Sequence, residues 1–267
     1  MPSEYNPQLV ENMSAKFRRL NNPAHAMADA IGMLQILPGI VGIWSGGTPG
    51  PSGQLIDKSG NGLSLTRQNG LFGVDSNTLI SRLSFDSTIP RYWDRTDEAI
   101  TSITGTEAYI IPKGLTILCW LNIPAIGAST QTGIAKWNAT GDQRSYALFF
   151  DNAGNALGQI SNNGTASGIK SLSIGTYPTN QWAFFAYRFT PSTEVAGWIN
   201  RTKTTNTSSV PASIFDSTAN FTIGATHGGG NALSGRGSLL ALFAAAVPDI
   251  FIDTYFQMTA PLFGVTV

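Results

Sequence analysis

Residues 42–65 read Gly-Ile-Trp-Ser-Gly-Gly-Thr-Pro-Gly-Pro-Ser-Gly-Gln-Leu-Ile-Asp-Lys-Ser-Gly-Asn-Gly-Leu-Ser-Leu, and this stretch decides the fold. A short apolar segment ends at Trp44 and runs into a loop of Gly, Pro and Ser. A tight turn begins at Asp57, and a second alternating segment follows it. Gly60 and Gly62 can adopt positive φ, and the Asp57 carboxylate can accept hydrogen bonds from the amides that follow it. The stretch therefore predicts two strands joined through a well specified turn.

The composition points to a single β-rich unit. The chain has 267 residues, which suffices for one large β-sandwich with an appendage but would crowd a second full domain. Only 12% of the residues are charged and 10% are aromatic, while glycine is abundant. A low charge content with many small polar residues is typical of short strands joined by polar turns.

Several classes of protein are excluded by charge and by single residues. The formal net charge is zero, so the chain lacks the basic face that nucleic-acid binding needs. Cys119 is the only cysteine, so an intrachain disulfide cannot form. The first residues show no signal peptide. Residues 27–44 are apolar but contain Asp29, Gln35 and Pro38, which argue against a membrane span.

The N-terminal region, residues 7–37, carries the one strong helical pattern. Pro23, preceded by two asparagines, interrupts it and predicts two short helices or one kinked helix. Two interpretations remain open: the helices pack on their own sandwich, or they form an arm that docks or oligomerises. The second interpretation assigns the contact to the apolar positions spaced three and four apart. These candidate docking residues are Met13, Phe17, Leu20, Met27, Ile31 and Leu34.

The rest of the chain alternates apolar segments with turn signals, which predicts a series of antiparallel strands. A helix is predicted from Pro248 to about Met258. The expected organisation is a helical arm over 1–38, a β-sandwich over 39–260 and a tail over 261–267. The predicted strands cover residues 78–85, 91–93, 115–123, 133–137, 146–150, 157–160, 168–174, 182–189, 195–199, 221–223 and 238–247.

Five strand segments, in this order, resemble the laminin-G-like domains of the concanavalin A-like superfamily. They are Leu-Ser-Phe-Asp at 83–86, Leu-Thr-Ile-Leu-Cys-Trp-Leu at 115–121, Asn-Gln-Trp-Ala-Phe-Phe-Ala at 180–186, Ala-Gly-Trp-Ile-Asn at 196–200 and Phe-Thr-Ile-Gly at 221–224. With the turn at Asp57, the resemblance extends over roughly residues 40–258. It implies a mainly β fold, an antiparallel jelly-roll sandwich with a helical N-terminal arm. The fold hosts lectins, glycosidases, receptor modules and viral proteins, so it does not settle function.

A narrower resemblance concerns structural proteins of tailed bacteriophages. It rests on the helical arm leading through Leu-Pro-Gly at 37–39, on residues 103–105, 141–146 and 189–194, and on Leu-Phe-Gly-Val at 262–265. The resemblance implies a virion component, made in the host cytoplasm, whose partners are other virion proteins. In that hypothesis the arm docks to the particle or builds a small homo-oligomer, with a trimer favoured.

Glycosidases of the superfamily need two or three carboxylates on one strand face, because one acts as nucleophile and another as acid. The tightest acidic group, Asp94 with Asp97 and Glu98, is predicted to lie in a solvated loop. No glutamate has a partner at strand spacing; the five are Glu4, Glu11, Glu98, Glu107 and Glu194. The only histidines are His25 and His227, and no nucleophile elbow accompanies them. These residues argue against an enzyme.

Two kinds of ligand site remain as hypotheses. Calcium takes oxygen ligands at the rim of many laminin-G-like domains, and Asp142, Asp151 and Asn231 lie in loops that could converge there. No other cofactor is expected. A glycan site would need an exposed aromatic side chain beside polar loop groups, and three aromatic residues lie near predicted strand ends. These are Trp93, Trp137 and Tyr177.

The sequence is therefore interpreted as a non-enzymatic virion structural protein, attached to the capsid, neck or tail by its arm. Its sandwich would face outward as a decoration or an adhesin that contacts a host-surface glycan. A carbohydrate-binding lectin module is the first alternative, and a glucanase-type glycosidase is the second.

Overall fold

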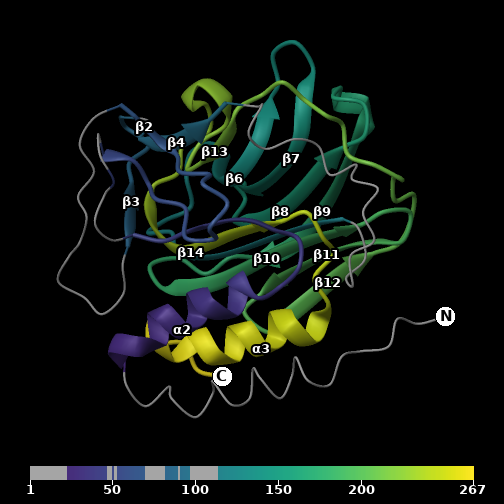
Figure 1. Cartoon of the computed structure of the whole chain (residues 1–267). Coiled ribbons are helices and arrows are strands. Elements are labelled where there is room, and N and C mark those ends of the chain that lie inside the picture. The colour runs from purple at the N-terminus through teal and green to yellow at the C-terminus, as the bar shows by residue number, and fades with distance from the viewer. Residues whose placement is uncertain (1–22, 47–49, 51–52, 70–81, 90, 97–113) are drawn as a thin grey trace.

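The protein is described by a computed structural model over residues 23–46, 50, 53–69, 82–89, 91–96 and 114–267. Two antiparallel sheets lie face to face, and two helices lie side by side below them (Figure 1). This is the antiparallel sandwich that the sequence predicts. The mainly β fold class is thereby confirmed.

Sheet 1 has the strand order β1-β14-β5-β10-β11-β12, and β3 pairs with one end of β14. All of its pairs are antiparallel. The strands are β1 (Ile40–Trp44), β3 (Leu83–Phe85), β5 (Leu115–Asn122), β10 (Trp182–Thr190), β11 (Glu194–Ile199), β12 (Thr202–Asn206) and β14 (Gly235–Phe243).

Sheet 2 has the order β2-β4-β13-β6-β7-β8-β9, and it too is antiparallel throughout. The strands from β6 to β9 form a meander of successive hairpins. The strands are β2 (Thr66–Gln68), β4 (Tyr92–Arg95), β13 (Phe221–Ile223), β6 (Gln131–Asn138), β7 (Gln143–Phe150), β8 (Asn155–Ser161) and β9 (Ile169–Thr176). Three short 3₁₀ helices lie among the later elements: η3 (Ala166–Gly168), η4 (His227–Gly229) and η5 (Ala260–Phe263).

Strand β5 is buried on both faces, as its nearly continuous apolar sequence predicts. Ile117 and Cys119 belong to the main core between the two sheets, together with Phe185 of the neighbouring strand β10 and Phe150 of sheet 2. Trp120, on the opposite face of β5, belongs to a second core outside sheet 1. Burial of such large apolar side chains from water is the main source of stability for a sandwich with so few charges.

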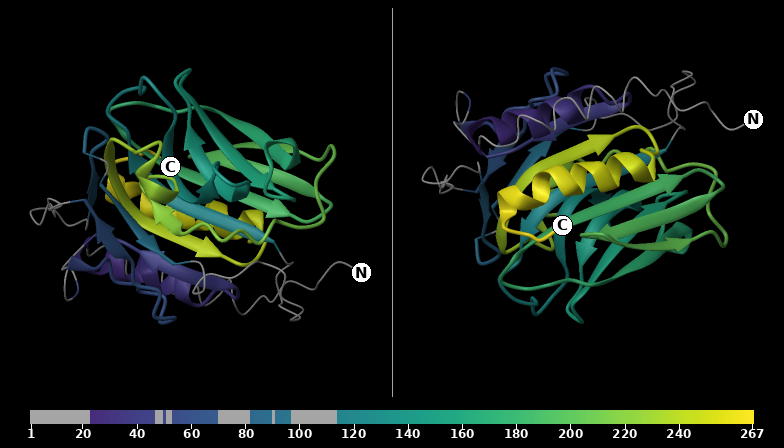
Figure 2. Two further views of the ribbon diagram at one scale, coloured as in Figure 1. Left: turned by 90° about the horizontal axis from the view of Figure 1, so that it is seen from above. Right: turned by 90° about the horizontal axis from the view of Figure 1, so that it is seen from below.

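The second core is covered by α2 (Pro23–Gln35) and α3 (Asp249–Thr259), which lie side by side over the outer face of sheet 1 (Figures 1 and 2). Trp120 is its centre: its ring stacks on Phe263 of η5 at 4.3 Å and on Phe256 of α3 at 5.9 Å between ring centroids. The helix predicted to start at Pro23 does so. The described part of the N-terminal region therefore packs on the sandwich, which is the first of the two interpretations of its pattern.

The turn at Asp57 fixes the start of the sandwich as the sequence predicts. The Asp57 carboxylate accepts hydrogen bonds from the amides of Ile43 (3.0 Å), Ser59 (2.8 Å) and Leu63 (2.9 Å). The Asn61 side chain donates to the Ile40 carbonyl at 2.9 Å. The side chains of the turn thus hold it against β1.

Three local features of the structure differ from what the sequence predicts. The strand after the turn begins at Thr66, because Leu65 pairs only with Leu55 in an isolated bridge. Asp94 is a residue of β4 and not of a loop. Strand β12, Thr-Lys-Thr-Thr-Asn, is not predicted from the sequence, because it is a polar edge strand without apolar alternation.

Candidate functional site

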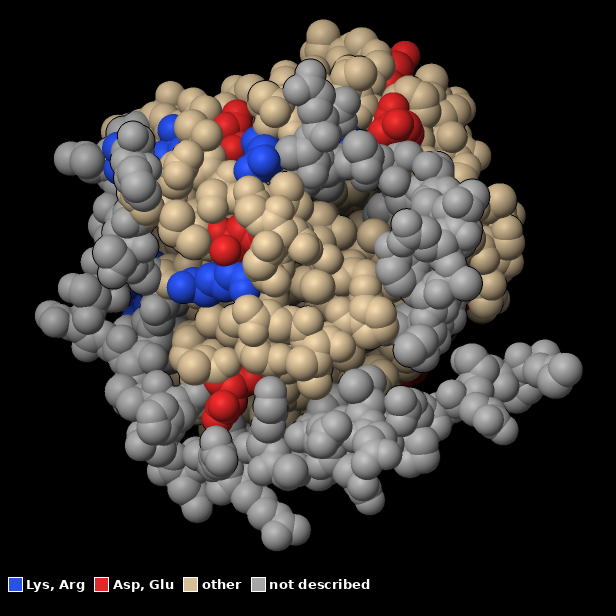
Figure 3. All heavy atoms as spheres, viewed as in Figure 1, with Lys and Arg blue, Asp and Glu red and all other residues tan. Residues whose placement is uncertain are grey.

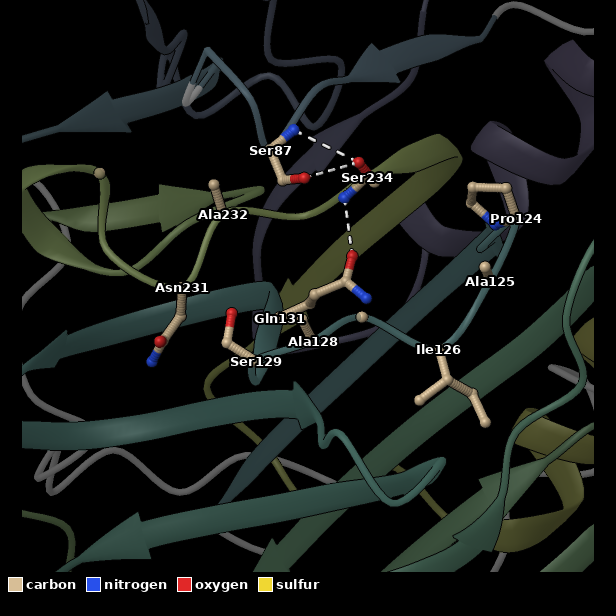
Figure 4. A pocket seen from close by; sticks show the side chains of 12 residues that line it. Ser87, Pro124, Ala125, Ile126, Ala128, Ser129, Gln131, Asn231, Ala232 and Ser234 are labelled. Carbon is tan, nitrogen blue, oxygen red and sulfur yellow. Dashed lines mark hydrogen bonds between the residues drawn. The ribbon is translucent and has the colours of Figure 1, made fainter.

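The candidate site is a pocket at the rim of the sandwich, here called the rim pocket, with a volume of about 520 Å³ (Figure 4). Two long loops form most of it: the β5–β6 loop contributes residues 124–129, and the β13–β14 loop contributes four residues between Gly229 and Ser234. Ser87, which follows β3, and Gln131, which begins β6, complete the lining. Segments far apart in the sequence therefore meet at one end of the sandwich.

The β13–β14 loop is held by its own backbone. The Thr226 amide donates to the Gly230 carbonyl at 2.7 Å, and the Leu233 amide donates to the Gly224 carbonyl at 2.8 Å. Asn231 has a φ of 48°, in the left-handed region that asparagine tolerates. Leu233 is fully buried and anchors the loop in the main core. The loop therefore presents its polar groups from a defined backbone.

A chain of three polar side chains ties the two loops to the end of β3. The Ser234 amide donates to the Gln131 side-chain oxygen at 2.8 Å, and the Ser87 amide donates to Ser234 Oγ at 3.3 Å (Figure 4). The Ser87 and Ser234 hydroxyls are 2.9 Å apart. Gln131 lies between the two loops in this view, with its side-chain nitrogen on the other side from Ser234. The side-chain nitrogen lies close to Gly127 of the β5–β6 loop, at the wall of the pocket.

The lining that the structure describes consists of neutral groups only. Ser129 and Asn231 are exposed and supply a hydroxyl and an amide. Ile126 is 48% exposed and gives the pocket an apolar wall. Such a lining can exchange hydrogen bonds and bury apolar carbon, but it offers no charge to a ligand.

The three aromatic residues predicted as a glycan platform are side chains of the folded interior. Trp93, Trp137 and Tyr177 are 4%, 6% and 2% exposed. Trp93 packs edge-on against Phe85, and the Tyr177 ring packs edge-on against Phe150. None of the three presents a face to solvent, because the strand ends near which they lie are covered by neighbouring side chains. The predicted platform is therefore wrong.

Trp137 belongs to a small separate cluster on the outer face of sheet 2. It meets Phe149 edge-on at 5.5 Å between ring centroids, with Ala135 and Ala147 beside them. These residues alternate along β6 and β7 with residues of the main core, such as Ile134 and Leu148. The second face of sheet 2 is thus partly apolar as well.

The three residues predicted as calcium ligands do not converge. Asp142 and Asp151 flank opposite ends of the eight-residue strand β7, roughly 30 Å apart at the rise of an extended chain. Asp142 pairs with Arg144 at 2.6 Å. Asn231 lines the rim pocket together with Gln131. Gln131 pairs with Phe150, the residue before Asp151, so Asn231 lies at the Asp151 end of β7. The predicted constellation is therefore corrected, and no group of three metal-binding side chains occurs in the described ranges.

Asp151 has a local role in the turn after β7. Burial alone would raise its pKa, but hydrogen bonds from Asn155, Ala153 and Gly154 outweigh burial and lower the pKa below its usual value. The Asn155 amide donates to the carboxylate at 2.7 Å. The Tyr177 hydroxyl donates to the Asp151 carbonyl at 3.3 Å, and burial followed by the charge of Asp151 raises the pKa of Tyr177.

The predicted docking residues divide into two groups. Met13, Phe17 and Leu20 lie outside the described residues. Leu34 is fully buried in the second core, and Met27 and Ile31 pack partly buried against it. These last three side chains thus contact their own sandwich. No helix of the described residues has the length and apolar character to cross a membrane.

His227, one of the two histidines of the chain, lies on η4. Its Nδ1 accepts a hydrogen bond from the Asn220 amide at 3.2 Å, so this nitrogen is committed to the backbone. The bond holds η4 against the start of β13.

Most of the rim-pocket residues are not predicted as site residues from the sequence. The segment Pro-Ala-Ile-Gly-Ala-Ser-Thr at 124–130 stands between two strongly apolar strands, and an isoleucine in such a loop is a signal of an exposed apolar wall. The oxygen of Asn231 marks it in the sequence as a candidate calcium ligand, and the structure places it in the lining of the rim pocket instead. Gln131 looks like any polar residue at the start of a strand, and only the fold brings it to Ser234.

The family follows from comparison with known proteins. A laminin-G model described as the concanavalin A-like lectin/glucanases superfamily matches residues 96–248, more than half of the chain. The chain belongs to this superfamily, and the predicted family is confirmed. Among curated proteins no match was found.

Several solved structures with a similar fold are binding domains of botulinum neurotoxins and of a mosquitocidal protein. The binding domain of Paraclostridial Mosquitocidal Protein 1 has 12% identity and a TM-score of 0.61, over 88% of this chain and 56% of that one. A botulinum neurotoxin type C structure has 12% identity and a TM-score of 0.59, over 86% and 52%. The serotype D ligand binding domain in complex with N-acetylneuraminic acid has 13% identity and a TM-score of 0.58, over 85% and 52%. The chain spans about half the length of these structures, and likeness at this identity shows the fold alone.

Proposed function

We propose that this chain is a non-enzymatic recognition module of the lectin type, which binds a neutral glycan in the rim pocket. The observation that carries the proposal is the lining of that pocket: hydrogen-bonding side chains without charge beside the exposed Ile126. A sugar ring has hydroxyls around its edge and apolar C–H groups on its faces. Both kinds of surface find a counterpart in the pocket.

The distribution of charge supports a neutral ligand. Lys, Arg, Asp and Glu form separate spots on the face seen in Figure 3, and neither sign gathers into a patch there. A sialylated or phosphorylated ligand would gain from a cation in the pocket, and the described lining supplies none.

The structural neighbours support the lectin class in general terms. One is in complex with N-acetylneuraminic acid, and cell entry of another depends on two ganglioside molecules, as their descriptions state. Those are properties of the toxins. For this chain they support binding to a surface glycan and not a particular sugar.

A glycan array probed with the full chain tests the proposal. Binding to neutral glycans is expected, and Asn231→Gly should weaken it several-fold, because the variant removes the amide but keeps a residue that accepts a positive φ. Ser167→Ala, on η3, is a control that should bind like the wild type. An array without a positive neutral glycan, or equal binding by Asn231→Gly, contradicts the proposal.

The absence of catalysis is part of the proposal and has its own test. The superfamily includes glucanases. Hydrolysis of β-glucans by the purified chain would contradict the proposed lectin function and would indicate a glycosidase. We expect no turnover above the buffer rate. Support comes from the neighbours, which are binding domains by their descriptions.

The location of the module on a bacteriophage particle is a further part of the proposal. It is supported by the resemblance of residues 141–146, 189–194 and 262–265 to phage structural proteins, with other virion proteins as partners and the host glycan as the target. Mass spectrometry of purified particles should then find the chain. Light scattering of the full chain should give a trimer or a larger oligomer. If the chain is a monomer and is absent from particles, the proposed location on a bacteriophage particle is wrong. The proposal that the chain binds a glycan would not be affected.

A further inference from the structure

A second pocket, of about 450 Å³, lies at the edge of sheet 2 formed by β2 and β4 and shares no lining residue with the rim pocket. Its wall is built from β2, β4 and the residue before β13. Thr66 and Gln68 come from β2, Asp94 comes from β4, and Asn220 precedes β13. We call it the Asp94 pocket.

Asp94 is held in place from both sides. Its backbone pairs with Thr66 of β2 and with Thr222 of β13, so the strand cannot slide without breaking both ladders. Gln68 Nε2 donates to Oδ1 at 2.9 Å, and Asn220 Nδ2 donates to Oδ2 at 3.1 Å. The carboxylate is therefore oriented by the protein before any ligand arrives.

The carboxylate retains unused capacity. A carboxylate offers about four acceptor positions, and the two amides occupy two of them. Within the described part of the chain Asp94 makes no ion pair, because the guanidinium of the neighbouring Arg95 donates instead to the carbonyls of Gly62 and Ser64, both at 3.0 Å. Among the described residues, no side-chain contact uses the second N–H or the amide oxygen of Gln68 or of Asn220, so both groups can serve a ligand.

We propose that Asp94, Gln68 and Asn220 form a second site, which binds a neutral saccharide through two adjacent hydroxyls. The hydroxyls donate to the Asp94 carboxylate, and the amide N–H groups of Gln68 and Asn220 donate back to the hydroxyl oxygens. Thr66 adds a hydroxyl at the wall of the pocket. Arg95 also lines the pocket, but its guanidinium donates to the carbonyls of Gly62 and Ser64, so an anionic sugar would face the Asp94 carboxylate without a free cation beside it among the described lining residues. Calcium needs six or more oxygen ligands, and this pocket supplies only one carboxylate among its described lining residues, so it does not fit calcium.

The test is an NMR titration of the full chain that follows the side-chain NH₂ signals of Gln68 and Asn220. The probes are methyl α-mannoside and methyl β-galactoside, which present adjacent hydroxyls. Tetrahydropyran-2-methanol has the ring without adjacent hydroxyls, and methylammonium tests for simple attraction of a cation. A glycoside should shift both signals, and the two control compounds should not.

Two variants of the site and two control variants make the test specific. Asp94→Asn keeps the shape and should weaken glycoside binding about tenfold or more, since bonds to a charged acceptor are the stronger ones. Thr66→Val leaves the Asp94 hydrogen bonds untouched and should weaken binding a few-fold, while Thr205→Val on β12 should bind as the wild type. Asn231→Gly should also leave these shifts unchanged, which separates this site from the rim pocket.

The site is overturned by any of three results. The first is that no glycoside shifts the Gln68 and Asn220 signals. The second is an equal shift with tetrahydropyran-2-methanol or methylammonium. The third is wild-type affinity in folded Asp94→Asn and Thr66→Val.

Discussion

The indole Nε1 of Trp120 donates a hydrogen bond of 2.9 Å to Thr259 Oγ1, which joins the centre of sheet 1 to the end of α3. Both groups are fully buried, and the Thr259 hydroxyl in turn donates to the Tyr255 carbonyl at 2.7 Å. A buried indole N–H that loses its acceptor keeps its desolvation penalty without compensation. The bond therefore couples the second core to the sandwich.

Thr259→Val should lower the free energy of unfolding by about 1–3 kcal/mol, because the shape is kept while the acceptor of the Trp120 N–H is lost. Urea unfolding followed by tryptophan fluorescence measures the change. Thr205→Val on the exposed edge of β12 is the matched control and should remain within about 0.5 kcal/mol of the wild type. An equal effect of the two substitutions would show that the indole bond contributes nothing.

Leu34→Ala should destabilise the protein by about 2–5 kcal/mol, the usual range for emptying a fully buried leucine site. Ile36→Ala, two residues on and 38% exposed, should cost much less. The difference arises because α2 buries Leu34 in the second core. If Leu34→Ala unfolds at the same denaturant concentration as the wild type, α2 does not pack on sheet 1.

Tyr187→Phe should leave stability unchanged or raise it by about 1 kcal/mol. The Tyr187 hydroxyl is fully buried in the main core and has no hydrogen-bond partner among the described residues, so its removal deletes an uncompensated polar group. Its ring lies directly over Gly158, where a Cβ would come within 2.0 Å of the ring, so the ring itself is tightly placed. Thermal unfolding of the two proteins gives the sign, and a clear loss of stability would reveal a partner for the hydroxyl.

The ion pairs of Asp249 should make stability fall in acid. Its carboxylate accepts from Arg188 at 2.5 Å and from Lys203 at 2.6 Å. Burial alone would raise its pKa, but the hydrogen bonds and charges of these two cations outweigh burial and lower the pKa below 3.8. A carboxyl with a lowered folded-state pKa stabilises the protein above its unfolded pKa, and the contribution is lost as pH falls through the folded pKa.

Asp249→Asn removes that contribution. The unfolding free energies of the wild type and Asp249→Asn should differ by a constant amount between about pH 5 and pH 8, and the difference should shrink below about pH 4. Urea titrations at a series of pH values measure it. A difference that persists unchanged to pH 2 would contradict the assignment.

Much of the fold can be predicted from local chemistry. The apolar run that forms β5 predicts a strand with both faces covered, and Asp57 with its glycines predicts the turn that the structure contains. Pro23 predicts the start of α2. Polar strand β12 could not be predicted, because its position at the edge of sheet 1 leaves no apolar face to mark it.

Sites were harder to predict than strands, because they depend on which strand ends meet. Asp142 and Asp151 are nine residues apart in sequence, yet the length of β7 keeps them apart in space. Trp137 looks available at a strand end, but Phe149 of the neighbouring strand packs against it. Gln68 and Asn220 are far apart in the chain, and only the β2–β4–β13 ladders bring both to Asp94.

The affinity of two isoleucine variants for the best neutral glycan of the array tests the central claim most directly. Ile126 and Ile250 are both 48% exposed, but only Ile126 lines the rim pocket, whereas Ile250 lies on α3. Calorimetry of Ile126→Ser should show a dissociation constant raised about tenfold, since roughly 1–2 kcal/mol of apolar contact is lost. Ile250→Ser should bind as the wild type. Equal affinity in the two variants would contradict binding in the rim pocket.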